Sequence, residues 1–86
     1  MQSVYKYKVI PYAWATLLPD GAKILSVGEQ DDEVYVWALV NPAIPAETPR
    51  RIRAYGTGHP IEDGERVFIG TVQMQNGLVF HFFEEV

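Results

Sequence analysis

The sequence predicts an all-β fold, a small antiparallel sheet or open barrel of five to six strands with little or no helix. Several short segments alternate between apolar and polar residues, which is the period of a half-buried strand. No segment keeps a helical period over three turns. An Asn76-Gly77 dipeptide separates two apolar runs, which is the pattern of a β-hairpin.

Length and composition indicate one domain that spans residues 1–86. The chain is 48% hydrophobic and 13% aromatic, which is enough apolar surface to fold. It contains no cysteine, so disulfides and thiolate metal sites are excluded. Small cores without covalent cross-links often gain burial by association, and we expect a homo-oligomer. The net charge of −4, from 7 basic and 11 acidic residues, argues against nucleic-acid polymers and membrane surfaces as partners.

The N-terminal half contains four predicted strands. Val4 to Ile10 places tyrosines on one face and lysines on the other, as an edge strand does. Pro11 to Gly21 is predicted to hold a short strand that enters a turn. Lys23 to Glu29 and Glu33 to Val40 form a hairpin with an acidic tip, expected to be a solvated turn. Both faces of the second run are apolar, so it is predicted to be a central strand with Trp37 in the core.

The C-terminal half begins with a proline-rich stretch. Asn41 to Pro49 holds three of the six prolines and is predicted to be a loop. Arg50 to Tyr55 alternates again and is predicted to be a strand.

The last two strands, Arg66 to Gln75 and Leu78 to Glu85, are predicted to join through a two-residue type I′ turn. That turn places Thr71 opposite Phe82. Both faces of the hairpin then carry large apolar groups, so one face needs a loop or a second subunit, with Phe82 as an interface residue.

The strongest binding signal lies around residues 51–59. Two glycines in Gly56-Thr57-Gly58-His59-Pro60 permit close backbone approach to an anion. Arginines precede this loop, and a guanidinium pair beside an aromatic ring suits a phosphate that carries a base. The predicted ligand-binding residues are Arg51, Arg53, Tyr55, Thr57 and His59. The alternatives are a simple turn and a solvated strand face.

No residues in the sequence have the spacing of a metal or catalytic site. His59 and His81 show no metal-ligand spacing, and His81 is expected to be a packed, hydrogen-bonded histidine. No GxSxG motif is present, so we expect neither a cofactor nor catalysis. Trp14 is open to an interface or ligand role as well as a core position.

The order of several segments resembles a family of short proteins of unassigned function found in phages and in bacteria that carry prophages. The resemblance rests on residues 18–25 (LPDGAKIL), 37–40 (WALV), 56–61 (GTGHPI), 69–73 (IGTVQ) and 80–84 (FHFFE). It implies a phage setting. By analogy, small phage accessory proteins counter host defence by capturing a nucleotide signal or by docking on a defence protein.

Two functions therefore remain open. One is a non-enzymatic phage accessory protein that binds and sequesters a nucleotide-derived anionic small molecule, at a subunit interface. The other is a phage inhibitor that binds a host defence protein directly through an aromatic and acidic surface. The N-terminus has no apolar stretch typical of a signal peptide, so we expect a cytoplasmic protein of an infected bacterial host.

Overall fold

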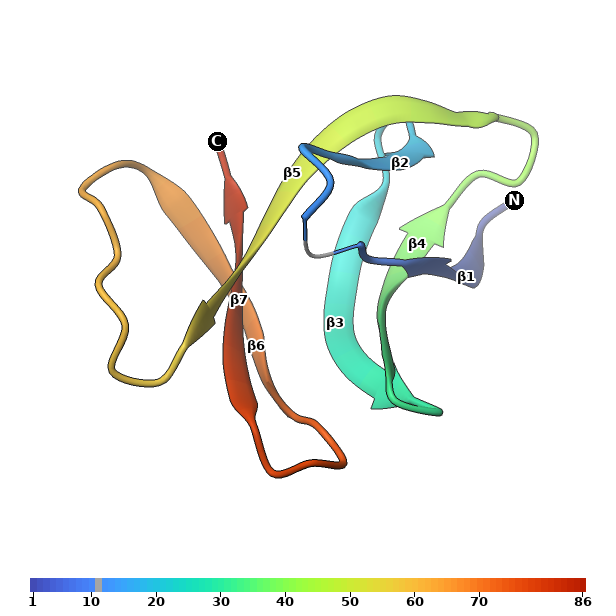
Figure 1. Ribbon diagram of the computed structural model, residues 1–86. Coiled ribbons are helices and arrows are strands. Elements are labelled where there is room, and N and C mark those ends of the chain that lie inside the picture. The colour runs from blue at the N-terminus through green and yellow to red at the C-terminus, as the bar shows by residue number, and fades with distance from the viewer. Residues whose placement is uncertain (11) are drawn as a thin grey trace.

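The computed structural model describes residues 1–10 and 12–86, and the predicted all-β antiparallel class is confirmed (Figure 1). The described residues contain no helix. Within the described ranges seven strands, one more than the predicted maximum, form two sheets that do not close into a barrel. The strands are β1 (Ser3–Lys8), β2 (Thr16–Pro19), β3 (Lys23–Gln30), β4 (Glu33–Val40), β5 (Ala46–Gly56), β6 (Arg66–Gln73) and β7 (Val79–Glu85).

The first sheet has the order β1-β4-β3, so β4 is central, as predicted. Its even-numbered residues from Val34 to Val40 are buried in the core. The prediction that Trp37 lies in the core is wrong. Trp37 has an odd number and therefore faces the other side of the strand from these buried residues. The indole is instead covered by its own sheet: a Cβ added at Gly28 would lie 3.2 Å from Cζ3 of Trp37. A glycine on β3 therefore lets a large ring lie against the outer face.

The second sheet has the order β2-β5-β7-β6. β5 begins at Ala46, so the predicted loop of residues 41–49 is too long by four residues. The first half of β5 pairs with β2, where Pro49 lies opposite Leu17, and its second half pairs with β7 from Arg51 onward. Proline is tolerated here because this part of β5 is bonded on one side only. The predicted short strand is β2, while Pro11 lies outside the described residues.

Of the two hairpin turns, the acidic one between β3 and β4 lies where it was predicted, and the one between β6 and β7 has a different length. Asp31 and Asp32 both have positive φ, 52° and 62°, and form the two-residue turn expected of a type I′ hairpin. Gly77 has a φ of 89°, and the Met74 amide bonds to the Leu78 carbonyl, which leaves a three-residue loop. The predicted type I′ turn at Asn76-Gly77 is therefore wrong, and the register shifts by one residue.

That register shift decides which side chains are buried. Thr71 pairs with His81, and Phe82 pairs with Gly70 and faces the core with 1% of its surface exposed. The expectation that Phe82 lies at an interface is therefore wrong. The buried hydrophobic residues come from both sheets: Val9, Leu18, Ala22, Val34, Val36, Ala38, Val40, Ile52, Val72 and Phe82.

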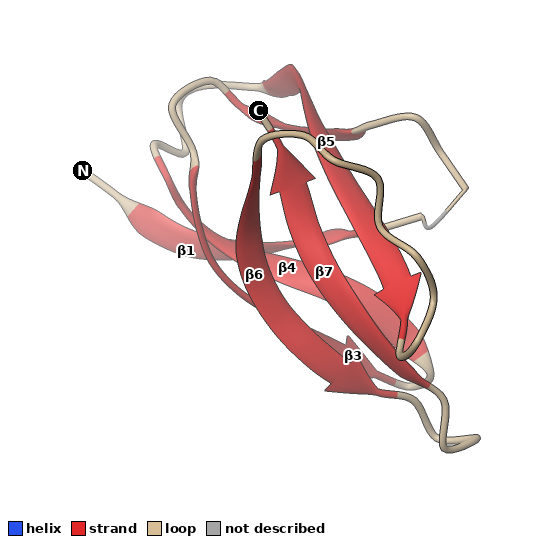
Figure 2. Ribbon diagram, turned by 90° about the vertical axis from the view of Figure 1, so that its left-hand side faces the viewer, coloured by secondary structure: helices blue, strands red, loops and turns tan. Residues whose placement is uncertain are grey.

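The outer face of the four-stranded sheet is crossed by the loop between β5 and β6. β5 and β6 flank β7 and are both antiparallel to it, so the loop must return along the length of the sheet. Figure 2 shows this loop passing in front of the sheet. A loop of the same chain, one of the two predicted possibilities, therefore crosses this face.

Candidate functional site

Strand β5 sorts its side chains between two environments. Ile52 is 3% exposed and faces the core. Arg51, Arg53 and Tyr55 have the opposite parity and share the outer face of the four-stranded sheet. The structure thus brings three of the five predicted binding residues onto one face.

Glu85 on β7 is the carboxylate nearest to the two outward arginines. It pairs with Arg51 in the strand register, and its Oε1 lies 3.6 Å from Nε of Arg51 and 3.4 Å from Nε of Arg53. Both separations are longer than the roughly 2.7 to 3.2 Å of a normal N–H···O hydrogen bond, so both contacts are loose ion pairs. Arg51 keeps 56% of its side chain exposed, whereas Arg53 keeps 24%. Most of the hydrogen-bonding capacity of Arg51 is therefore free for another partner.

Arg53 also holds the segment before β2 against the sheet. Its Nη2 donates to the carbonyl of Trp14 at 2.9 Å, and its Nη1 is 3.5 Å from the carbonyl of Ala13. Trp14 is nevertheless 66% exposed, and nearby Tyr12 is 92% exposed. The guanidinium of Arg53 thus tethers the backbone of an exposed tryptophan to this face.

Tyr55 belongs to a row of aromatic rings across three strands. Its ring meets that of Phe83 at a centroid distance of 5.8 Å, and Phe83 meets Phe68 at 5.3 Å, both in edge-to-face geometry. The guanidinium carbon of Arg66 lies 5.8 Å from the Tyr55 centroid, within cation–π range. Arg66 also donates to the Glu62 carbonyl of the crossing loop at 2.5 Å.

Arg66 adds a third guanidinium to the face. It lies opposite Glu85 in the β6–β7 register, as Arg51 does from β5. Its Nε is buried and has no hydrogen-bond partner among the described residues. A buried polar atom of this kind is uncommon in folded proteins and calls for a partner.

Thr57 lies at the far end of the strand from the arginines. It is four residues beyond Arg53, or about 13 Å along an extended chain. Its Oγ1 is 2.7 Å from Nε2 of His81, and Oγ1 of Thr71 is 3.0 Å from Nδ1 of the same ring. Both ring nitrogens are therefore occupied, and His81 is hydrogen-bonded as expected.

His59 belongs to a tight turn. Its amide donates to the Gly56 carbonyl at 3.0 Å, and Gly58 has a φ of 84°, which a type II turn requires at this position. The imidazole lies against Gly56, where an added Cβ would be 2.9 Å from Nδ1. The ring also lines an open cavity of about 490 Å³ with Leu78 and Phe80. The structure brings neither His59 nor Thr57 into contact with the arginines.

Sequence reasoning missed the residues that complete the arginine face, namely Arg66, Phe68, Phe83 and Glu85. All four alternate correctly within the predicted final hairpin, so their outward parity was available as a signal. The residues that lie beside them on the adjacent strand could not be predicted, because the predicted register was wrong by one residue.

Residues 1–10 and 12–86 show neither a metal-binding cluster nor a membrane-spanning helix. No three histidine or acidic side chains in these ranges gather closely enough to hold a metal ion. None of these residues forms a helix long and apolar enough to cross a membrane.

A family described as a domain of unknown function (DUF7352) matches residues 1–86. No curated protein and no solved structure matches the chain.

Proposed function

The chain belongs to the DUF7352 family, and from its own residues we propose that it is a non-enzymatic protein that binds and sequesters a nucleotide-derived anion. The observation that carries the proposal is the common outward face of Arg51, Arg53 and Tyr55, to which Arg66 adds a third guanidinium. Guanidinium groups bind phosphate oxygens in pairs, and an aromatic row beside them suits a base.

The loose contacts of Glu85 support capture of a phosphate. A phosphate oxygen at normal hydrogen-bond distance would bind Arg51 more strongly than a carboxylate at 3.6 Å does. The exposed indole of Trp14 is tethered beside Arg53 and offers a surface for stacking. Stacking of one base on an aromatic side chain contributes roughly 1 to 3 kcal/mol.

Sequestration requires binding without turnover, and the two hydroxyl–imidazole contacts of His81 fit that role. Thr57 bonds to His81, but the second nitrogen of His81 is held by Thr71 and not by a carboxylate. The orienting acid of a catalytic triad has no counterpart in this arrangement. In an infected bacterium, the captured molecule would be a nucleotide signal of host defence, which makes the protein a cytoplasmic counter-defence factor.

Titration calorimetry with a panel of cyclic and linear nucleotides tests the proposal. At least one nucleotide should bind, and Arg51→Ala should weaken its binding tenfold or more, because a phosphate contact is lost. The matched control is Lys8→Ala, which removes an ion-paired cation of similar exposure, 52%, from the other sheet. The proposal fails if no nucleotide gives heat, or if the control weakens binding as much as Arg51→Ala.

A specific observation favours direct binding to a host defence protein as the second candidate. Tyr12, Trp14 and Leu17 are 92%, 66% and 52% exposed, and tyrosine and tryptophan are enriched at interface hot spots. The crossing loop carries Glu62, Asp63 and Glu65, which would suit a basic partner. This function predicts that Trp14→Ala abolishes protection of a phage in infected cells while Arg51→Ala does not.

Association into a homo-oligomer is part of either function. Val67 and Phe68 are 58% and 56% exposed on β6, which is an edge strand. Exposed apolar edge strands pair readily with other chains. Light scattering at tens of micromolar should give a mass above the 9.7 kDa of one chain; a single-chain mass contradicts this expectation.

A further inference from the structure

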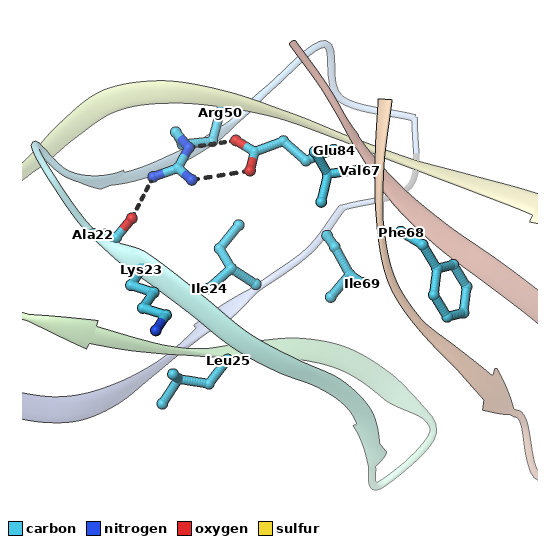
Figure 3. A pocket seen from close by; sticks show the side chains of 9 residues that line it. All are labelled: Ala22, Lys23, Ile24, Leu25, Arg50, Val67, Phe68, Ile69 and Glu84. Atoms are coloured by element: carbon cyan, nitrogen blue, oxygen red, sulfur yellow. Dashed lines mark hydrogen bonds and ion pairs between the residues drawn. The ribbon is translucent and has the colours of Figure 1, made fainter. Parts of the chain in front are cut away.

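The open seam between the two sheets contains a cavity of about 370 Å³ (Figure 3). β3 and β6 are the edge strands that meet there. They touch at Gly70, where an added Cβ would lie 2.9 Å from Cγ1 of Val27. Toward the beginning of both strands the seam holds the cavity, and its volume falls in the usual range for small-molecule sites.

The walls of the cavity are apolar. They come from Ile24 and Leu25 on β3 and from Val67, Phe68 and Ile69 on β6, although the side chains of Leu25 and Phe68 point away from the space between the strands in Figure 3. Figure 3 shows the side chains of Ile24 and Ile69 standing in the space between the two strands. Leu25, Val67 and Phe68 are 46%, 58% and 56% exposed, so this side of the seam leaves considerable apolar surface in water.

One end of the cavity is polar and is formed by Arg50 and Glu84. The guanidinium bonds to the carboxylate through Nε and Nη2, the latter to Oε1 at 2.9 Å, and its Nη1 donates to the Ala22 carbonyl at 2.8 Å. Both side chains are mostly buried, with 23% and 20% exposed. The hydrogen bond that Arg50 donates to Glu84 raises the pKa of Arg50. The charge of the guanidinium is offset by the carboxylate that it contacts.

This pair retains capacity for further hydrogen bonds. A guanidinium has five N–H donors, and three of them are used in the bonds above, so two have no partner among the described residues. Each carboxylate oxygen accepts one of these bonds and has a further lone pair. The polar end of the cavity therefore presents free donors beside free acceptors.

We propose that this cavity binds a small, uncharged, planar molecule whose edge carries a hydrogen-bond donor beside an acceptor, as an aromatic carboxamide does. The apolar walls would enclose the ring, and the amide edge would meet Arg50 and Glu84. An anion would be repelled by Glu84 and a cation by Arg50. Lys23, the other cation lining the cavity, points away from the pair in Figure 3 and would not compensate an anion there.

Titration of the isotope-labelled protein, followed by amide and methyl NMR shifts, tests the proposal with benzamide and benzoate. These probes share a shape but differ in charge. Benzamide should shift the signals of Ile24 and Ile69 with a Kd on the order of millimolar, as befits so small a ligand. Benzoate should bind at least fivefold more weakly. Equal binding of the two probes, or shifts outside the seam, would overturn the assignment.

Two variants sharpen the result. Glu84→Gln keeps the size of the side chain but leaves the Arg50 charge uncompensated, so the preference should reverse in favour of benzoate; an unchanged preference contradicts the proposal. Ile69→Phe should fill the cavity and reduce benzamide binding at least fivefold. Ile61→Phe, the same change at a residue 41% exposed on the crossing loop, should leave binding unaltered. Failure of nucleotide binding at Arg51 has no bearing on these outcomes, because the Arg51 side chain lies on the opposite face of the sheet from the Arg50–Glu84 pair.

Discussion

Arg50 and Arg51 are consecutive on one strand, yet they lie in opposite environments. Arg50 points inward, binds Glu84 through two nitrogens and holds the Ala22 carbonyl. Arg51 points outward and has one loose contact with Glu85. Strand parity alone separates them, since neighbouring side chains project to opposite faces. The comparison teaches that a cluster of arginines in a sequence can combine a structural guanidinium with one available for a ligand.

The largest stability effect is expected for Arg50→Ala. The substitution leaves the mostly buried Glu84 carboxylate without its ion-pair partner and removes the hydrogen bond to the Ala22 carbonyl in the turn before β3. Breaking a pair of this burial should cost about 2 kcal/mol of unfolding free energy and lower the Tm by about 10 °C. Thermal unfolding followed by circular dichroism measures it. A Tm within experimental error of the unmodified protein would show that Arg50 is not structural.

Arg53→Ala should have an intermediate effect. It removes the hydrogen bond to the Trp14 carbonyl, which is worth about 1 kcal/mol. The backbone of residues 13–14 should become more mobile, and amide hydrogen exchange in this segment should accelerate. Arg53→Lys provides the matched control, because it keeps the charge but loses the fork of donors. Equal protection in all three proteins would contradict a tethering role.

The smallest stability effect is expected for Arg51→Ala. Its side chain is 56% exposed, so chemical denaturation should give an unfolding free energy within about 0.5 kcal/mol of the unmodified protein. Ligand affinity, in contrast, should fall as described above. A large loss of stability would place Arg51 with Arg50 and remove the distinction between the two arginines.

Much of the fold follows from local pattern. Alternation alone locates β1 with its lysine face, and the apolar character of both faces makes β4 central. The turns do not follow as easily. Asn-Gly suits a type I′ turn, but the chain adopts a three-residue loop there, whereas Asp31 and Asp32 adopt the two-residue turn despite a less typical sequence. Loop length depends on packing between sheets as well as on local propensity, and that information is not local.

In the candidate site, too, some residues could be predicted from local pattern and others could not. The outward parity of Arg51, Arg53 and Tyr55 follows from one buried neighbour, Ile52. The contribution of Arg66 depends on which residue of β7 it meets, and a register error of one residue conceals it. The position of Trp14 beside Arg53 depends on a contact across 39 residues of chain, which no periodicity encodes.

The tips of the two hairpins are fastened to each other. Glu29 accepts a hydrogen bond from the Gln75 side chain at 2.9 Å, and Asp32 accepts one from the Gln75 amide at 3.4 Å. Both tips lie at the lower end of the molecule in Figure 1, and the seam cavity lies toward the opposite ends of β3 and β6. The two sheets are therefore linked at both ends of the seam, by Gln75 at the tips and, beside the cavity, by the bond from Arg50 on β5 to the Ala22 carbonyl just before β3. Separating the sheets at the cavity would therefore require the Arg50–Ala22 bond to break, whereas the tips would stay joined through Gln75.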